Sequence, residues 1–196
     1  MFVTSPDWDL LLQQLINQHW RYAVLDVLMP VFSSSIVLWI CSVAALASAW
    51  PDKRKLLIGL ILLGTAVAAS DLTCSILKDL SGRVRPLQSI ARTWYVDDGN
   101  WTQLPADFTQ IKHKGSSFPS AHAANSAAAT SVLVFLLRKK SIWIVPLLIG
   151  YSRIYLGKHF PLDVVAGWIL GLLIGRGVQP LYAWLQKKLP QFDREA

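Results

Sequence analysis

Five apolar stretches dominate the pattern of hydrophobic and polar positions in this chain of 196 residues. They cover residues 22–50, 55–78, 120–137, 141–156 and 161–185. The first, second and fifth reach the roughly 20 residues that a helix needs to cross the hydrocarbon core of a bilayer. The other two fit as buried spans, and no stretch alternates with the period of two that barrel strands require. The pattern predicts an all-α integral membrane protein, a bundle of about five transmembrane helices.

An amphipathic segment precedes the first apolar stretch, at residues 5–20. Its leucines and Ile16 recur at helical spacing, which predicts a helix that lies on the bilayer surface. The polar residues that oppose them are Asp7, Gln13, Gln14 and Asn17.

One long connection, residues 79–119, lies between the second and third stretches. Loops of this length in a compact domain are usually functional or disordered. We expect an interfacial lid, because the loop combines charged residues with aromatic ones, Trp94, Tyr95, Trp101 and Phe108. No internal repeat divides the sequence, and residues 1–196 are predicted to form a single domain.

Composition agrees with a membrane protein. Apolar residues make up 53% of the chain, and charged residues make up 16%, against roughly 25% in soluble domains. Both cysteines, Cys41 and Cys74, lie inside apolar stretches, so a disulfide framework is not expected. The last stretch carries Gly167, Gly171 and Gly175 at four-residue spacing, which indicates close helix packing within the bundle more than a dimer contact. The oligomeric state stays open.

The net charge of +7 is compatible with nucleic acid or with anionic lipid as a partner. One set of cations lies at tight turns or near the end of the chain: Lys53, Arg54, Lys55, Arg138, Lys139, Lys140, Lys187 and Lys188. Under the positive-inside rule this set marks the cytoplasmic side. A second set lies at the opposite ends of the same stretches: Lys78, Arg83, Arg85, Arg92, Lys112, Lys114, Arg153 and Lys158. We expect a membrane lipid as partner, no nucleic acid, and an extracytoplasmic position for residues 79–119 and 153–161.

Three polar clusters fall at this outer side: KDLSGRVRP at residues 78–86, FPSAH at 118–122 and SRIYLGKHFPLD at 152–163. They are distant in sequence, but the predicted spans place them in one plane of the membrane. Lys78, Arg85 and Arg153 supply positive charge, and arginine has a planar fork that matches phosphate oxygens. Ser120 falls in the first turn of a helix opened by Pro119, where free N–H groups and the helix dipole favour an anion.

The two histidines of these clusters indicate covalent catalysis. His159 lies four residues before Asp163, so the carboxylate could hold one imidazole nitrogen and leave the other to attack phosphorus. His122 could then protonate the leaving group. We expect no metal and no cofactor, because the fixed cations supply the charge stabilisation that a metal would give.

These clusters resemble the signature of the type 2 phosphatidic acid phosphatase (PAP2) superfamily. That signature is Lys, six residues, Arg-Pro; then Pro-Ser-Gly-His; then Ser-Arg, five residues, His, three residues, Asp. The matching residues are Lys78, Arg85, Pro86, Pro119, Ser120, Ala121, His122, Ser152, Arg153, His159 and Asp163. The chain is also compact, like the small bacterial lipid phosphatases of the family.

The resemblance implies a phosphohistidine intermediate on His159, with His122 as acid and then base and Asp163 as the group that orients His159. It also implies a phosphate site made by Lys78, Arg85, Ser120 and Arg153. Ala121 replaces the usual glycine of the signature. Its backbone N–H can still donate to phosphate, although its methyl group narrows the site, and we expect activity to survive.

We therefore expect hydrolysis of a lipid phosphate or diphosphate at the outer face of a bacterial inner membrane. Undecaprenyl diphosphate is the preferred substrate, and lipid A 1-phosphate, phosphatidylglycerophosphate and phosphatidate are alternatives. A non-catalytic lipid-binding or transport protein and a phosphotransferase also stay open. Asp71, inside the second stretch, is expected to pair with Lys78 or another cation.

Overall fold

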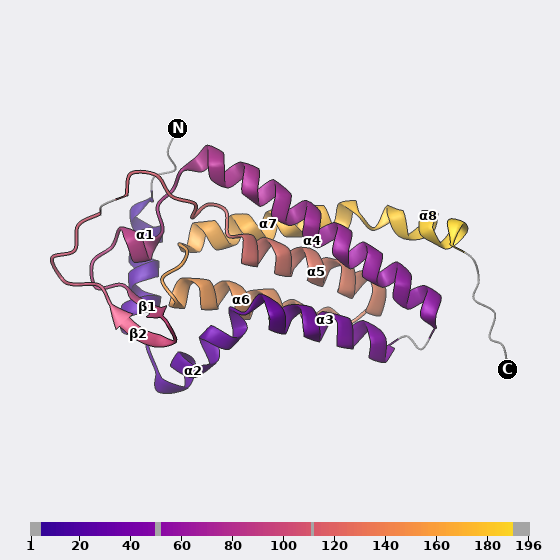
Figure 1. The fold of residues 1–196 in the computed structure, drawn as a ribbon, viewed down its shortest axis with the longest axis horizontal. Helices are drawn as coiled ribbons and strands as arrows, with labels where there is room; N and C mark the ends of the chain where they lie inside the picture. Colours follow the sequence, from indigo (N-terminus) through magenta and orange to yellow (C-terminus); the bar gives the residue numbers. More distant parts are fainter. Residues whose placement is uncertain (1–4, 50–51, 111, 190–196) are drawn as a thin grey trace.

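The computed structural model describes residues 5–49, 52–110 and 112–189, and most of them are helical. Five helices run along the long axis of the molecule (Figure 1): α3 (Ser35–Ala49), α4 (Lys53–Ser81), α5 (Ala121–Leu137), α6 (Ile144–Tyr155) and α7 (Pro161–Gly177). Helix α5 is central, since it contacts each of the other four. A β-hairpin and the N-terminal helix α1 (Asp7–Gln14) gather at one end, and α8 (Pro180–Lys188) lies at the other.

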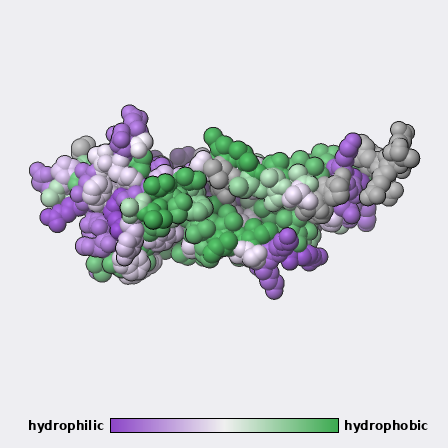
Figure 2. Space-filling model, turned by 90° about the horizontal axis from the view of Figure 1, so that it is seen from below, coloured by the Kyte–Doolittle hydropathy of each residue, from purple (hydrophilic) through white to green (hydrophobic). Residues whose placement is uncertain are grey.

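The surface of the bundle is apolar along the middle of its long axis, whereas hydrophilic residues gather toward both ends (Figure 2). By length and hydropathy, two helical segments of the described chain qualify as membrane spans, Lys53–Gln88 and Pro161–Lys188. The remaining apolar helices are shorter. A total of five spans therefore stays a prediction.

The first predicted span is broken in the structure. Its described part forms α2 (Ala23–Phe32) and α3, separated by a turn at Ser33 and Ser34. Pro30 lies inside α2 and cannot donate a backbone hydrogen bond, which weakens the helix near its end. Similar interruptions split the later stretches: a 3₁₀ turn, Lys140–Trp143, precedes α6, and residues 178–179 separate α7 from α8.

Close contact between α5 and α7 positions the N-terminus of α5. The glycine stripe of α7 faces buried alanines of α5, as the sequence predicts for packing within one bundle. A Cβ atom at Gly171 would collide with the backbone carbonyl of Ala124, and one at Gly167 would lie 2.5 Å from the carbonyl of Ser120.

We therefore expect Gly171→Ala to lower the free energy of unfolding by about 1–3 kcal/mol, because the obstructing atoms belong to the backbone and must move apart. Thermal unfolding of the purified protein in detergent measures this. Gly64→Ala in α4 is the matched control, since nothing lies within 4 Å of a Cβ there. That variant should be as stable as the parent or slightly more stable. Equal behaviour of the two variants would contradict the packing argument.

The N-terminal helix turns its polar side toward the protein. Asp9, Gln13 and Asn17 are fully buried, whereas Trp8 is 53% and Leu11 64% exposed. A π-helical turn, Leu15–His19, follows α1. The expected amphipathic segment is present, and its buried side consists of Asp9, Gln13, Ile16 and Asn17, whereas Asp7 is exposed.

The long loop contains a hairpin that the sequence analysis did not predict. Strands β1 (Trp94–Asp97) and β2 (Asn100–Gln103) pair antiparallel across Asp98 and Gly99, which both have positive φ angles of 44° and 82°. Such angles are typical of a two-residue hairpin turn, for which Asp-Gly is a favoured pair. The Arg21 guanidinium stacks on Trp101, 4.0 Å from the ring centroid, and fastens the hairpin to the bundle.

Candidate active site

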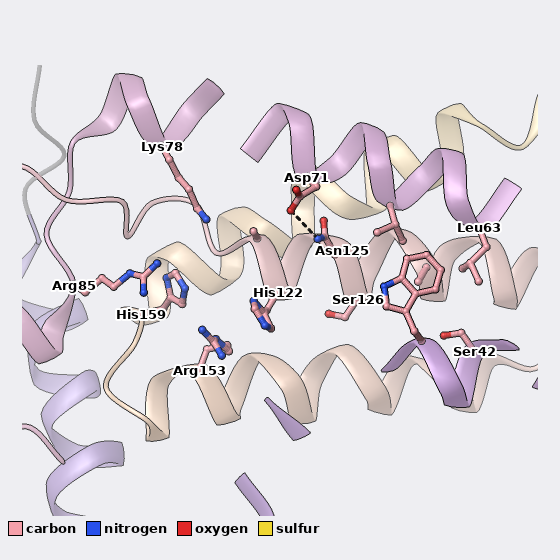
Figure 3. A pocket seen from close by; sticks show the side chains of 14 residues that line it. Ser42, Leu63, Asp71, Lys78, Arg85, His122, Asn125, Ser126, Arg153 and His159 are labelled. Atoms are coloured by element: carbon pink, nitrogen blue, oxygen red, sulfur yellow. Dashed lines mark hydrogen bonds between the residues drawn. The ribbon is translucent and has the colours of Figure 1, made fainter. Parts of the chain in front are cut away.

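A pocket of about 350 Å³ opens among the ends of α4, α5 and α6 and extends between α3, α4 and α5 (Figure 3). Six of the predicted site residues line it: Lys78, Arg85, Ala121, His122, Arg153 and His159. The structure thus brings both histidines and three cations to one cavity. Ser120 and Asp163 do not line the pocket, and both are fully buried behind it.

The three cations reach the pocket from different elements. Lys78 lies in the last turn of α4, Arg85 in the loop that follows, and Arg153 in the last turn of α6. Arg153 is 5% exposed and donates a hydrogen bond to the Ser33 hydroxyl at the break between α2 and α3. In residues 5–49, 52–110 and 112–189, none of the three cations forms an ion pair with a carboxylate. This unbalanced positive charge suits a phosphate group.

The surroundings of His159 define which ring nitrogen carries the proton. Its Nδ1 lies 2.8 Å from the backbone carbonyl of Ser117, and a carbonyl can only accept. The proton therefore sits on Nδ1, and Nε2 keeps its lone pair. Burial lowers the pKa of His159 to about 4, and the nearby Asp163 carboxylate opposes this effect only in part. At neutral pH the ring is uncharged, as a nucleophilic role would require.

Asp163 supports His159 from a greater distance than its place in the sequence suggests. The separation between its Oδ2 and the imidazole Nδ1 is 3.6 Å. The same oxygen accepts hydrogen bonds from the Ser117 hydroxyl at 2.6 Å and from the Phe160 backbone N–H at 2.9 Å. Asp163 thus accepts a hydrogen bond from Ser117, and the carbonyl of Ser117 in turn accepts one from His159. Its orienting role, direct or through Ser117, stays a prediction.

A buried ion-pair network behind Asp163 was missed in the sequence analysis. Arg83 is 3% exposed, and its guanidinium pairs with Asp163 on one side and with Asp9 of α1 on the other. Asp9 also accepts a hydrogen bond from the Leu162 backbone N–H at 2.7 Å. The signal in the sequence is the polar residues of α1 at four-residue spacing, Asp9, Gln13 and Asn17.

The N-terminus of α5 presents the remaining predicted residues. The Ser120 hydroxyl caps the helix by accepting from the Ala123 N–H at 3.5 Å, and its backbone N–H donates to the Asp163 carbonyl at 2.9 Å. His122 points into the pocket, toward Arg153 (Figure 3). The phosphate-binding role of Ser120 stays a prediction, since its side chain serves as a helix cap.

The low pKa of His159 gives a direct prediction for pH dependence. Because the folded state favours the neutral ring, the imidazole should stay uncharged as the pH falls through 6.5 and take up a proton only near pH 4. NMR of ¹³C-labelled histidine in the substrate-free protein measures this midpoint, with His159→Gln to assign the signal. A midpoint near 6.5 would contradict a buried, neutral imidazole at this position.

Comparisons with known proteins agree with this geometry. A family model described as "PAP2 superfamily" matches residues 59–188. Phosphatidylglycerophosphatase B of Bacillus subtilis is 30% identical, over 82% of this chain and 74% of the relative. Undecaprenyl-diphosphatase of Sulfolobus acidocaldarius is 34% identical, over 81% of this chain and 70% of the relative. The crystal structure of Aquifex aeolicus LpxE superposes with a TM-score of 0.68 at 25% identity, over 92% of this chain and 99% of that one.

The match includes the three polar clusters at residues 78–86, 118–122 and 152–163, and the relatives are integral membrane phosphatases. The chain therefore belongs to the PAP2 superfamily and is a membrane enzyme that hydrolyses lipid phosphate esters.

Proposed function

We propose that this enzyme removes phosphate from a membrane lipid in two steps through a phosphohistidine on His159. The observation that carries the proposal is the uncharged Nε2 of His159 in a pocket lined by Lys78, Arg85 and Arg153. Attack by the Nε2 lone pair on phosphorus forms a P–N bond and breaks the P–O bond to the leaving group, which is the lipid alkoxide of a monophosphate or the lipid phosphate of a diphosphate. His122 donates the proton that the leaving oxygen needs.

Water then hydrolyses the intermediate. His122, now neutral, accepts a proton from the attacking water, the P–N bond breaks and inorganic phosphate is released. The cations stabilise the charge that builds on the phosphoryl oxygens in both steps, and the Ala121 backbone N–H adds a donor in this scheme. Neither step involves a metal. A protein that only bound or transported the lipid would have no use for the pairing of His159 with Asp163.

The proposed setting is the outer face of a bacterial inner membrane, with residues 1–196 acting as one domain. The basic turn at residues 138–140 supports this orientation, since it lies at the end of α5 opposite the pocket. The ion pair of Asp9 with Arg83, which also pairs with Asp163, supports a single domain, because it connects the first helix to the proposed catalytic residues.

For the lipid, a polyprenyl diphosphate such as undecaprenyl diphosphate is one proposed substrate, supported by the relative that acts on it. Phosphatidylglycerophosphate has similar support from another relative. Lipid A 1-phosphate and phosphatidate are the other candidates. The cations of the pocket bind phosphate, and all four lipids carry a phosphate group, so the cations do not distinguish among them.

The test is phosphate release by the purified enzyme from each of these lipids, with and without the chelator EDTA. We expect hydrolysis of at least one lipid at the same rate in both conditions, because fixed cations supply the positive charge. Loss of activity in EDTA that magnesium restores would contradict the metal-free mechanism. Transfer of the phosphoryl group to an added alcohol, with no free phosphate, would indicate a phosphotransferase.

A further inference from the structure

The pocket continues past the phosphate-binding end and carries a second polar site deeper in the bundle (Figure 3). Asp71 and Asn125 line this part, from α4 and α5 respectively. Asp71 precedes Lys78 by seven residues, about 10 Å along the helix axis, and Asn125 follows His122 by one turn. The pair thus lies in the same pocket as Lys78 and His122, deeper in the bundle.

The two side chains are joined in a defined orientation. The Asn125 amide nitrogen donates to Asp71 Oδ1 at 3.1 Å, which leaves the amide oxygen of Asn125 as an acceptor. That oxygen is buried and has no hydrogen-bond partner among the described residues. Asp71 is exposed to the pocket, and its second carboxylate oxygen also has no partner in the described part of the chain. The hydrogen bond of Asp71 thus goes to an amide, and the expected pairing with Lys78 is present only as a longer-range attraction.

An interhelical clamp alone does not explain this arrangement. The hydrogen bond between Asn125 and Asp71 joins α5 to α4 and stabilises the bundle. A purely structural contact would not need the additional acceptor oxygens of these two side chains in a pocket. Polar groups at membrane depth without partners cost free energy. Asp71 and Asn125 therefore keep acceptor oxygens that a bound substrate can use.

Resting on the proposed function, we infer that Asp71 and Asn125 form a subsite for the alcohol part of the substrate. The subsite accepts hydrogen bonds from hydroxyl or amide N–H groups a few bonds away from the phosphate ester. Glycerol and hexosamine lipids carry such donors. A polyprenyl chain carries none, so its binding would bury both acceptors against hydrocarbon. The subsite favours hydroxylated or amide-bearing lipid phosphates over polyprenyl diphosphates.

A matched pair of substrates isolates this contact. Hexadecylglycerol 3-phosphate has one free hydroxyl beside the phosphate ester, and hexadecyloxypropyl phosphate is the same molecule without it. We expect kcat/KM of the parent enzyme to be at least roughly 10-fold higher for the hydroxylated lipid, because a hydrogen bond to a charged acceptor is among the stronger ones. Equal values would overturn the inference. An absence of phosphate release from both of these lipids and from all four candidate lipids would instead overturn the proposed function.

Variants of Asp71 and Asn125 test whether these residues cause the preference for the hydroxylated lipid. Asp71→Ala should reduce the ratio of the two kcat/KM values to near one, and Asn125→Ala should lower it several-fold, because it removes the second acceptor and releases Asp71. Asp79→Ala is the matched control, since Asp79 is an exposed carboxylate on the same helix outside the pocket, and it should keep the parental ratio. An unchanged ratio in either pocket variant, checked for folding by gel filtration in detergent, would contradict the subsite. If one of them fails to fold, the other still decides.

Discussion

Replacing His159 with glutamine is expected to reduce turnover by about 10⁴-fold or more, the scale seen when a covalent nucleophile is removed. Glutamine fills a similar volume and can still donate to the Ser117 carbonyl, so the buried site should keep its shape. It has no nitrogen lone pair that can attack phosphorus. Phosphate release from a lipid substrate measures the loss, and trapping of labelled phosphate on the protein measures the intermediate.

His19→Gln is the matched control, because His19 is exposed and lies outside the pocket. It should retain parental turnover and phosphoenzyme. The His159 variant should still bind lipid, since Lys78, Arg85 and Arg153 remain. Hydrolysis by that variant at an ordinary rate would refute the covalent mechanism and transfer the nucleophile's role to water or to another residue.

Arg83→Met is expected to cause the largest loss of stability, about 3–5 kcal/mol in the free energy of unfolding. Arg83 lies between Asp9 and Asp163, and all three side chains are buried. Removal of the cation leaves two carboxylates in the interior without their common partner. The pKa of His159 is also expected to rise, because the negative charge of Asp163 is then no longer offset.

Thermal unfolding in detergent measures the first effect and histidine NMR the second. Arg176→Met, at an exposed position of α7, should change stability by no more than about 0.5 kcal/mol. Combining Arg83→Met with Asp9→Asn should cost less than the sum of the single changes, since the second change removes one of the stranded charges. Strict additivity would show that the two residues do not act as a pair.

The convergence of the signature residues could be predicted because membrane spans constrain the chain strongly. If helices cross a bilayer, their ends meet at one of two surfaces, so Lys78, His122 and His159 had to lie near one plane. Their common pocket is the structural outcome of that constraint. The helical class of the fold follows from the same argument.

The supporting contacts could not be predicted in this way. Arg83 and Arg85 look alike in the sequence, and only packing decides that Arg83 is buried in an ion pair while Arg85 reaches the pocket. The amide partner of Asp71 depends on the rotation of α5 against α4, which hydropathy does not specify. The pair Asp98-Gly99 is typical of a hairpin turn, whereas the aromatic residues around it are equally compatible with an interfacial lid.

Tethering of α1 to the active site has a practical consequence for truncated versions of this enzyme. A chain that begins after Asn17 would keep all three signature motifs and every predicted catalytic residue. It would nevertheless lack Asp9, and the Leu162 N–H would lose its acceptor. Motif searches would score such a fragment as intact, whereas we expect its Arg83, Asp163 and His159 to be positioned incorrectly.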